Sequence, residues 1–240
     1  MYLEVCAGFA NRLRATVSGI CAAEDLKCPL TISWPVESVC AAAFTDLFEP
    51  IDGIIICSSR NPSAHMCLSP ADWLKEKTNS NILIKSYGQF HQSDPARWNR
   101  ILRSLQLRPT LVEFAEKTIR LTYPIVGVHI RRTDNIVSRR KSPTHAFLKK
   151  MLTYDTNIFF FIATDDTNEW DIITKSIPVE RLVRANINHS RNTLSGIMGA
   201  VVDFLCLSKC SEILGSAGSS FSEMAAAYGE CPLYIINQDN

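Results

Sequence analysis

Short apolar segments alternate with helix-like segments along almost the whole chain, and this order constrains the fold more than any other feature. Strand–helix alternation is typical of parallel sheets covered by helices, so the expected fold class is α/β. The pattern predicts strands at 2–6, 30–34, 53–57, 82–87, 125–130, 157–164, 181–183, 213–215 and 233–236, and helices at 11–25, 94–105, 110–122, 167–175, 192–208 and 220–228.

The number of strands is too high for one doubly wound sheet. A division within 108–123 gives two Rossmann-like halves, 1–108 and 109–240, and 240 residues are enough for two small domains. Segment 58–81 contains Pro62 and Pro70 among polar residues. We expect it to be the longest loop of the N-terminal half.

Composition argues against several classes of protein. A formal net charge of +1 is unlike that of nucleic-acid-binding proteins, and the basic clusters Arg131-Arg132 and Arg139-Arg140-Lys141 fit one phosphate site. The most apolar run, 158–163, is far shorter than the roughly 20 residues that cross a bilayer, so we expect no membrane span and no targeting segment before the first strand. Nine cysteines without a C-x-x-C pair predict free thiols and a cytoplasmic location.

The expected strand 125–130 ends abruptly in Arg131, Arg132, Thr133 and Asp134. Ligands of open α/β sheets bind just beyond the carboxyl ends of strands. Alternation along the strand puts His129 and Arg131 on one face, so Arg131 can enter a cleft while Arg132 pairs elsewhere. A guanidinium suits a diphosphate because it offers forked donors to phosphate oxygens. A structural Arg–Asp cluster that closes the sheet edge explains the same residues equally well.

The expected strand 157–164 also ends in charge, at Asp165 and Asp166. One function for these carboxylates is to act on a hydroxyl group of a substrate. For one of the two, capping of the following helix is the better explanation. The pair does not have the acid-x-acid spacing of a metal-binding motif. Glu169 and Asp171 have that spacing but lie in the first turns of a helix, where acids favour the helix dipole.

The helix expected at 192–208 carries Asp203 on a stripe with Gly196 and Gly199. Glycines beside one carboxylate leave room for a flat ring, and an aspartate accepts hydrogen bonds from both N1–H and the 2-amino group of guanine. A solvated acid on a helix surface is the alternative.

Small residues at 215–222 join a strand to a helix that begins at Ser220, and backbone amides and hydroxyls at Ser219 and Ser220 can cradle an anion. An ordinary turn and N-cap has the same composition. After the first strand, a tight turn at Gly8 permits close backbone approach, and we expect Asn11 and Arg12 to point into the cleft between the halves.

Together these segments resemble the α1,2/α1,6- and protein O-fucosyltransferase superfamily over about 125–228. Residues 8–15 resemble it more weakly. The run from His129 to Asp134 looks like the family's H-x-R-R-x-D motif, and 161–166 looks like its second motif. Asp203 and Ser219, sixteen residues apart, match the spacing of the guanine-reading aspartate and the phosphate-binding serine. Asn135 departs from the lysine of the α1,6 branch.

The resemblance implies a GT-B fold, two Rossmann-like halves facing across a cleft, with the donor bound by 109–240 and the acceptor by 1–108. It implies a GDP-fucose donor, a glycan acceptor, inversion at the anomeric carbon, and no metal or cofactor. Arg131 would then hold the β-phosphate, while the acceptor's base stays open among Asp134, Asp165 and a residue such as Glu4. The alternatives are another nucleotide-sugar donor, rhamnosyl or xylosyl, and a non-catalytic nucleotide- or sugar-binding homologue.

Overall fold

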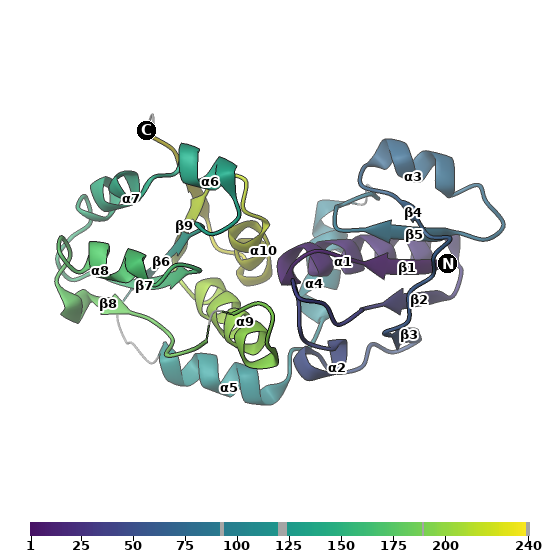
Figure 1. Cartoon of the computed structure of the whole chain (residues 1–240), viewed down its shortest axis with the longest axis horizontal. Helices are drawn as coiled ribbons and strands as arrows, with labels where there is room; N and C mark the ends of the chain where they lie inside the picture. The colour runs from purple at the N-terminus through teal and green to yellow at the C-terminus, as the bar shows by residue number, and fades with distance from the viewer. Residues whose placement is uncertain (92–93, 120–123, 189, 239–240) are drawn as a thin grey trace. The chain divides into compact units, whose positions relative to one another are not determined.

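The computed structural model describes residues 1–91, 94–119, 124–188 and 190–238, which form two compact units (Figure 1). Unit 1 consists of Met1–Pro109 together with Ser190–Met198, and unit 2 of the remaining described residues. The boundary expected from the sequence placed all of 109–240 in one half, whereas the structure assigns Ser190–Met198 to unit 1. This segment includes the start of helix α9 (Leu194–Ser208).

Unit 1 is built on a parallel five-stranded sheet in the order β3-β2-β1-β5-β4. In the central strand, Leu3 lies beside Ile32 and Ile84, and all three side chains are completely buried. The strands are β1 (Tyr2–Val5), β2 (Leu30–Ser33), β3 (Ile54–Cys57), β4 (His65–Met66) and β5 (Leu83–Ser86), and the helices are α1 (Phe9–Leu26), α2 (Phe44–Leu47), α3 (Pro70–Glu76) and α4 (Pro95–Ser104).

Helix α1 packs closely on the sheet of unit 1 because of one glycine. A Cβ atom at Gly19 would lie 2.5 Å from the Leu3 side chain, so a larger residue would require that side chain or the helix to shift. Helix α1 ends at Lys27, whose backbone is left-handed and donates to the carbonyls of Ala23 and Glu24.

Unit 2 contains the second parallel sheet, in the order β10-β9-β6-β7-β8. Every residue of its central strand is buried, and Val128 lies beside Ile162 and Leu214. Its strands are β6 (Ile125–Ile130), β7 (Phe159–Thr164), β8 (Leu182–Val183), β9 (Glu212–Ser216) and β10 (Leu233–Ile236), and its helices are α5 (Pro109–Thr118), which starts at the unit boundary, α6 (Ile136–Lys141), α7 (Thr144–Met151), α8 (Asn168–Ile173), most of α9, and α10 (Ser220–Gly229).

The strands expected at 125–130 and 233–236 have the observed bounds, and the other expected strands are found within two residues at each end. The helix expected at 110–122 is observed to Thr118, and residues 120–122 lie outside the described part of the chain. Segment 58–81 is not an unbroken loop, because it contains β4 and α3. Helices α2, α6 and α7 and the short 3₁₀ turn Val179–Arg181 were not expected.

Candidate functional site

Three of the four motifs of the C-terminal half meet at one edge of the sheet in unit 2. Strand β6 lies between β7 and β9, and all three run in the same direction, so Arg131, Asp165 and the segment after Ser216 follow neighbouring carboxyl ends. This is the position at which open α/β sheets bind ligands. The sequence-predicted residues of these three motifs are therefore brought together by the topology.

Arg131 is held between two carboxylates. Its guanidinium forms ion pairs with Asp134, three residues later, and with Asp165 at the end of the neighbouring strand. Its backbone N–H donates to Ser216 Oγ at 3.0 Å, and that hydroxyl donates to the carbonyl of His129 at 3.1 Å. The guanidinium is thus oriented by its neighbours before any ligand is present.

Asp165 organises the whole loop after β6. Its Oδ1 accepts the backbone N–H of Arg132 at 2.7 Å, and its Oδ2 accepts the hydroxyl of Thr133 at 2.6 Å in addition to Arg131. Asp166 instead accepts the N–H of Asn168, the first residue of α8, at 3.0 Å. Thr167 is the N-cap residue of α8 and makes no side-chain capping bond, so Asp166 is not the N-cap that was expected, although it satisfies the first N–H of the helix.

The side chain of Arg132 lies in a buried cluster and also donates to the carbonyl of Arg131 at 2.9 Å. It donates to Glu169 Oε1 at 2.6 Å and to Thr144 Oγ1 at 3.0 Å, and the threonine hydroxyl also contacts Glu169. Both Arg132 and Glu169 are buried, and such a pair stabilises only when its hydrogen bonds are satisfied, as they are here. Glu169 was expected only to favour a helix dipole. Its pairing with Arg132 was missed, because residues 37 positions apart give no local sequence signal.

His129 is a buried, neutral imidazole. Burial lowers its pKa to about 4, and its ring packs on Phe221 of α10 with centroids 4.9 Å apart. Within the described residues its Nδ1 atom is buried without a hydrogen-bond partner. Because an unsatisfied buried polar atom is costly, this nitrogen is a candidate contact for a ligand group.

The turn from β9 to α10 follows Ser216, whose hydroxyl accepts the backbone N–H of Arg131. Gly218 adopts a φ of +69°, which a side chain would strain, and Asn135 Nδ2 donates to its carbonyl at 3.0 Å. Ser219 is the N-cap residue of α10, is buried, and makes no side-chain capping bond. Ser220 is partly exposed at the first helical position. The free backbone N–H groups at the start of a helix attract anions, so the start of α10 can bind one.

Asp203 lies in the middle of α9 and is 5% exposed. Burial raises the pKa of its carboxyl well above the ordinary range, because the charged form is poorly solvated there. The room predicted beside it is absent at two positions. A Cβ at Gly196 would lie 1.8 Å from the carbonyl of Ser190, and one at Gly199 would lie 2.6 Å from that of Asn188, so the chain's own backbone occupies these faces.

The predicted residues of unit 1 are arranged differently from expectation. Arg12 was expected to point into a cleft, but its side chain is completely buried. It donates to the carbonyls of Ala7 at 2.8 Å and Pro35 at 2.6 Å and to Glu37 at 2.9 Å. These acceptors and its stacking over Trp34 make it a structural residue of unit 1, because three of its five N–H donors are already used within that unit.

The turn that Arg12 braces contains a strained residue. Ala7 has a φ of +66°, which is the left-handed region that favours glycine. Gly8 follows as the N-cap of α1, and a Cβ there would meet no atom closer than 3.9 Å. Asn11 lies in the first turn of α1 and is partly exposed. Gly8 and Asn11 remain predicted contacts.

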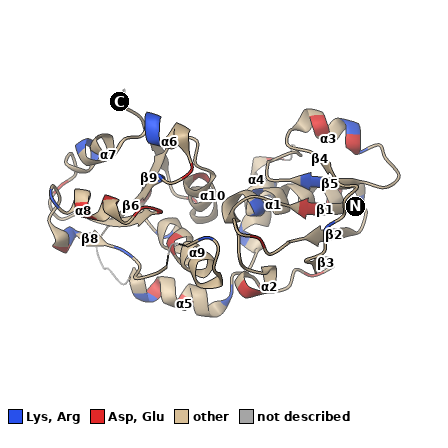
Figure 2. Cartoon of the chain, viewed as in Figure 1, with Lys and Arg blue, Asp and Glu red and all other residues tan. Residues whose placement is uncertain are grey.

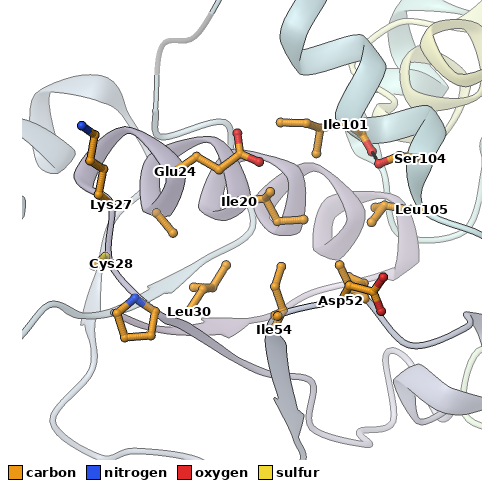
Figure 3. A pocket seen from close by; sticks show the side chains of 14 residues that line it. Ile20, Glu24, Lys27, Cys28, Leu30, Asp52, Ile54, Ile101, Ser104 and Leu105 are labelled. Carbon is orange, nitrogen blue, oxygen red and sulfur yellow. Dashed lines mark hydrogen bonds between the residues drawn. The ribbon is translucent and has the colours of Figure 1, made fainter.

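A cavity of about 430 Å³ lies elsewhere in unit 1, with α1 above it and strands β2 and β3 below (Figure 3). Leu30 and Ile54, which line it, are the first residues of their strands, so the cavity is at the amino edge of that sheet. The ligand edge of a parallel sheet is the opposite one. The cavity is therefore separate from the motif residues.

None of the helices in the described residues is long and apolar enough to cross a membrane. Within the same part of the chain, no three His, Cys, Asp or Glu side chains are grouped so that they could hold a metal ion. All nine cysteines are free thiols.

Comparison with known proteins gives matches in structure alone. No protein-family model and no curated protein matches the chain. The structure of NodZ α-1,6-fucosyltransferase soaked with GDP-fucose matches with a TM-score of 0.70 at 16% identity, over 100% of this chain and 96% of that chain. The chain has the fold of a fucosyltransferase. Fucosyltransferase NodZ from Bradyrhizobium matches with a TM-score of 0.66 at 17% identity, over 93% and 92% of the two chains.

POFUT1 in complex with GDP-fucose matches with a TM-score of 0.62 at 12% identity, over 98% of each chain. Two parallel five-stranded sheets and these matches confirm the predicted α/β, GT-B fold class. They also confirm, at the level of the fold, the resemblance read from the motifs.

Proposed function

We propose that this protein is an inverting glycosyltransferase that moves L-fucose from GDP-fucose to a hydroxyl of a glycan. One observation carries the proposal: Arg131, the start of α10 at Ser219 and the buried Asp203 belong to one unit whose fold is that of proteins solved with GDP-fucose. In this proposal residues 109–240 supply the donor site and 1–108 the acceptor site.

The charges define a mechanism for the departure of GDP. Negative charge grows on the β-phosphate as the bond to the sugar breaks, and oriented donors stabilise it most when they are fixed in advance. Arg131, aligned by Asp165, supplies a guanidinium, while the amides at Ser219 and Ser220 supply the positive end of α10. His129 is neutral at physiological pH, so it contributes a hydrogen bond to the donor rather than a charge.

Arg131 must exchange a partner when the diphosphate arrives. The Asp134 side chain is 59% exposed, whereas that of Asp165 is 16% exposed and fixed by three further hydrogen bonds. We therefore assign Asp134 as the partner that leaves and Asp165 as the one that stays. We also assign to Asp134 the proton of the attacking hydroxyl, because the oxygens of Asp165 are occupied by Arg131, Arg132 and Thr133.

Asp203 is assigned to the base of the nucleotide. A buried carboxylate with a raised pKa gains most from a ligand that brings two adjacent N–H donors, and guanine presents them while uracil does not. The same fold with a rhamnosyl or xylosyl donor is the second candidate, because the roles assigned to Arg131, Ser219 and Asp203 concern the diphosphate and the base and do not distinguish one sugar from another.

Titration with GDP and UDP, followed by turnover of labelled GDP-fucose, tests the proposal. We expect GDP to bind with micromolar affinity in EDTA and UDP to bind far more weakly. Loss of GDP binding in EDTA with recovery in Mg²⁺ or Mn²⁺ would contradict metal independence. Tight GDP binding without any transfer from GDP-fucose or GDP-rhamnose would instead indicate a non-catalytic nucleotide-binding protein.

A further inference from the structure

The basic residues of this chain are concentrated in one segment. Residues 135–154 contain five of the 25 lysines and arginines and none of the 24 aspartates and glutamates, although the whole chain has a net charge of only +1. The rest of the chain is therefore acidic on balance. Figure 2 shows the blue residues of this segment on α6 and α7.

The basic cluster of α6 differs from the Arg131-Arg132 cluster in its partners. Arg131 and Arg132 are both paired with carboxylates. Arg139, Arg140 and Lys141 are exposed, and in the part of the chain that the structure describes no carboxylate pairs with them. Unpaired like charges on one short helix repel each other, so the arrangement costs stability unless a ligand uses it.

Helix α6 is fixed to the proposed diphosphate site. Ser138 Oγ donates to the carbonyl of Ala217 at 2.7 Å, and Ser142 Oγ accepts the N–H of the same residue at 2.8 Å. Asn135 caps the helix through Ser138 N–H and donates to Gly218. These bonds hold one face of α6 against the turn that leads to α10.

The opposite face of α6 is exposed and mixed in character. Ile136 and Arg140 are four residues apart and share that face, with Val137 and Arg139 beside them. Ile136 is 56% exposed and Val137 50% exposed, although both are large apolar residues. Helix α6 begins two residues after Asp134, which contacts Arg131. We call Ile136, Val137, Arg139, Arg140 and Lys141 the α6 surface.

We propose that the contacts of the acceptor are not confined to residues 1–108: the α6 surface, which belongs to the donor half, binds an anionic group on the glycan, a carboxylate, sulfate or phosphate, and so selects acidic acceptors. This inference rests on the proposed function and adds a class of acceptor to it. The apolar pair contacts the C–H face of a sugar ring, and the cations contact the anionic group.

Two features favour a substrate over a membrane as the occupant. A six-residue helix offers a contact the size of one or two sugars, whereas interfacial helices that bind membranes are longer and have a wide apolar face. The hydrogen bonds to Ala217 and Gly218 also fix α6 relative to Arg131, which transfer to a bound acceptor requires and membrane attachment does not.

The first experiment compares a neutral tetrasaccharide with its uronate and sulfated counterparts by calorimetry, with GDP present. We expect both acidic forms to bind about tenfold more tightly than the neutral one at low salt. The preference should shrink in 0.5 M NaCl, because salt screens the attraction between exposed charges. Preference for only one acidic form names the anionic group. Equal binding of the three sugars by the wild-type protein overturns the proposal.

The double variant Arg139→Glu/Arg140→Glu locates the site. It should lose the preference for acidic sugars, raise the acceptor KM about tenfold and leave the donor KM unchanged. Lys75→Glu/Lys77→Glu in unit 1 changes the net charge equally on exposed residues and should behave as wild type. Equal losses in both variants would mean that only the net charge matters, which overturns the proposal.

Two further measurements separate the remaining explanations. Sedimentation with phosphatidylglycerol vesicles that is lost in Arg139→Glu/Arg140→Glu, without any sugar preference, would assign the α6 surface to a membrane and overturn the acceptor assignment. GDP is titrated separately. If the wild-type protein does not bind GDP but still prefers acidic sugars, and loses that preference in Arg139→Glu/Arg140→Glu, the proposed function is wrong. The binding of anionic glycans by the α6 surface would then still stand.

Discussion

Asp165 and Arg131 form an ion pair that connects the carboxyl ends of two neighbouring strands, β7 and β6. The carboxylate also binds the backbone of Arg132 and the hydroxyl of Thr133, so one side chain fixes both the direction of the guanidinium and the path of the loop that carries it. The proposed role of Arg131 depends on this arrangement.

We expect Arg131→Lys to lower kcat roughly a hundredfold, because a lysine has one point of charge and cannot provide a forked contact. Removal of one donor of this kind costs about 3 kcal/mol in the transition state. Steady-state kinetics with GDP-fucose measures the effect, and thermal unfolding checks that the variant is folded. A folded variant with nearly normal kcat would remove Arg131 from the leaving-group role.

Asp134→Asn should bind GDP more tightly than the wild-type protein, not more weakly. The variant removes a carboxylate that competes with the diphosphate for Arg131, and an exposed pair of this kind is worth about 0.2–1 kcal/mol. If Asp134 is also the base, kcat falls while GDP affinity rises. Weaker GDP binding in a folded Asp134→Asn protein would show that Asp134 does not compete with the donor.

Asp203→Ala should weaken GDP and leave UDP little changed. Each charged hydrogen bond lost in a partly desolvated site costs about 1.5–3 kcal/mol, while contacts to the ribose and phosphates remain. Calorimetric titration of both nucleotides gives the difference. Unchanged GDP affinity would mean that Asp203 does not contact guanine, and the GDP-fucose assignment would lose its main support.

Asp203→Asn should raise the thermal stability of the ligand-free protein at neutral pH. The folded-state pKa of Asp203 lies above its unfolded value, so the folded state keeps a proton that the unfolded chain has lost, and stability falls as pH rises through that interval. The variant has no such loss. Its advantage in Tm should vanish below about pH 4, where the wild-type carboxyl is protonated in both states.

The exposed Asp171→Asn on α8 serves as the control for this comparison, since it makes the same chemical change at a solvated position. An identical pH profile of Tm for wild type and Asp203→Asn would contradict the burial cost assigned to Asp203.

Strands and motif positions were predictable because they depend on local pattern. Strand β6 was predicted with its observed bounds, since six consecutive residues are buried-type and two arginines end the run. The short helices α6 and α7 were missed because a six- or eight-residue helix shows barely two turns of period. The Asn135 cap of α6 was the available local signal.

The contacts that individual side chains make were less predictable. Arg12 follows a tight turn in the way that ligand-binding residues do, but its acceptors include Pro35 and Glu37, which are more than 20 residues away. The glycines of α9 predicted open space, and residues 188 and 190 fill it. In both cases a distant part of the chain decides what the residue contacts, and one sequence does not show it.

The left-handed Ala7 and the buried Arg12 that binds its carbonyl have a consequence for the loop that leads to Asn11. A non-glycine residue in this conformation costs about 1–3 kcal/mol and persists only where its surroundings determine it, so this backbone is already ordered in the free protein. A substrate group that reaches Asn11 therefore meets a preorganised surface. Its binding does not include the loss of conformational entropy that ordering a flexible loop would add.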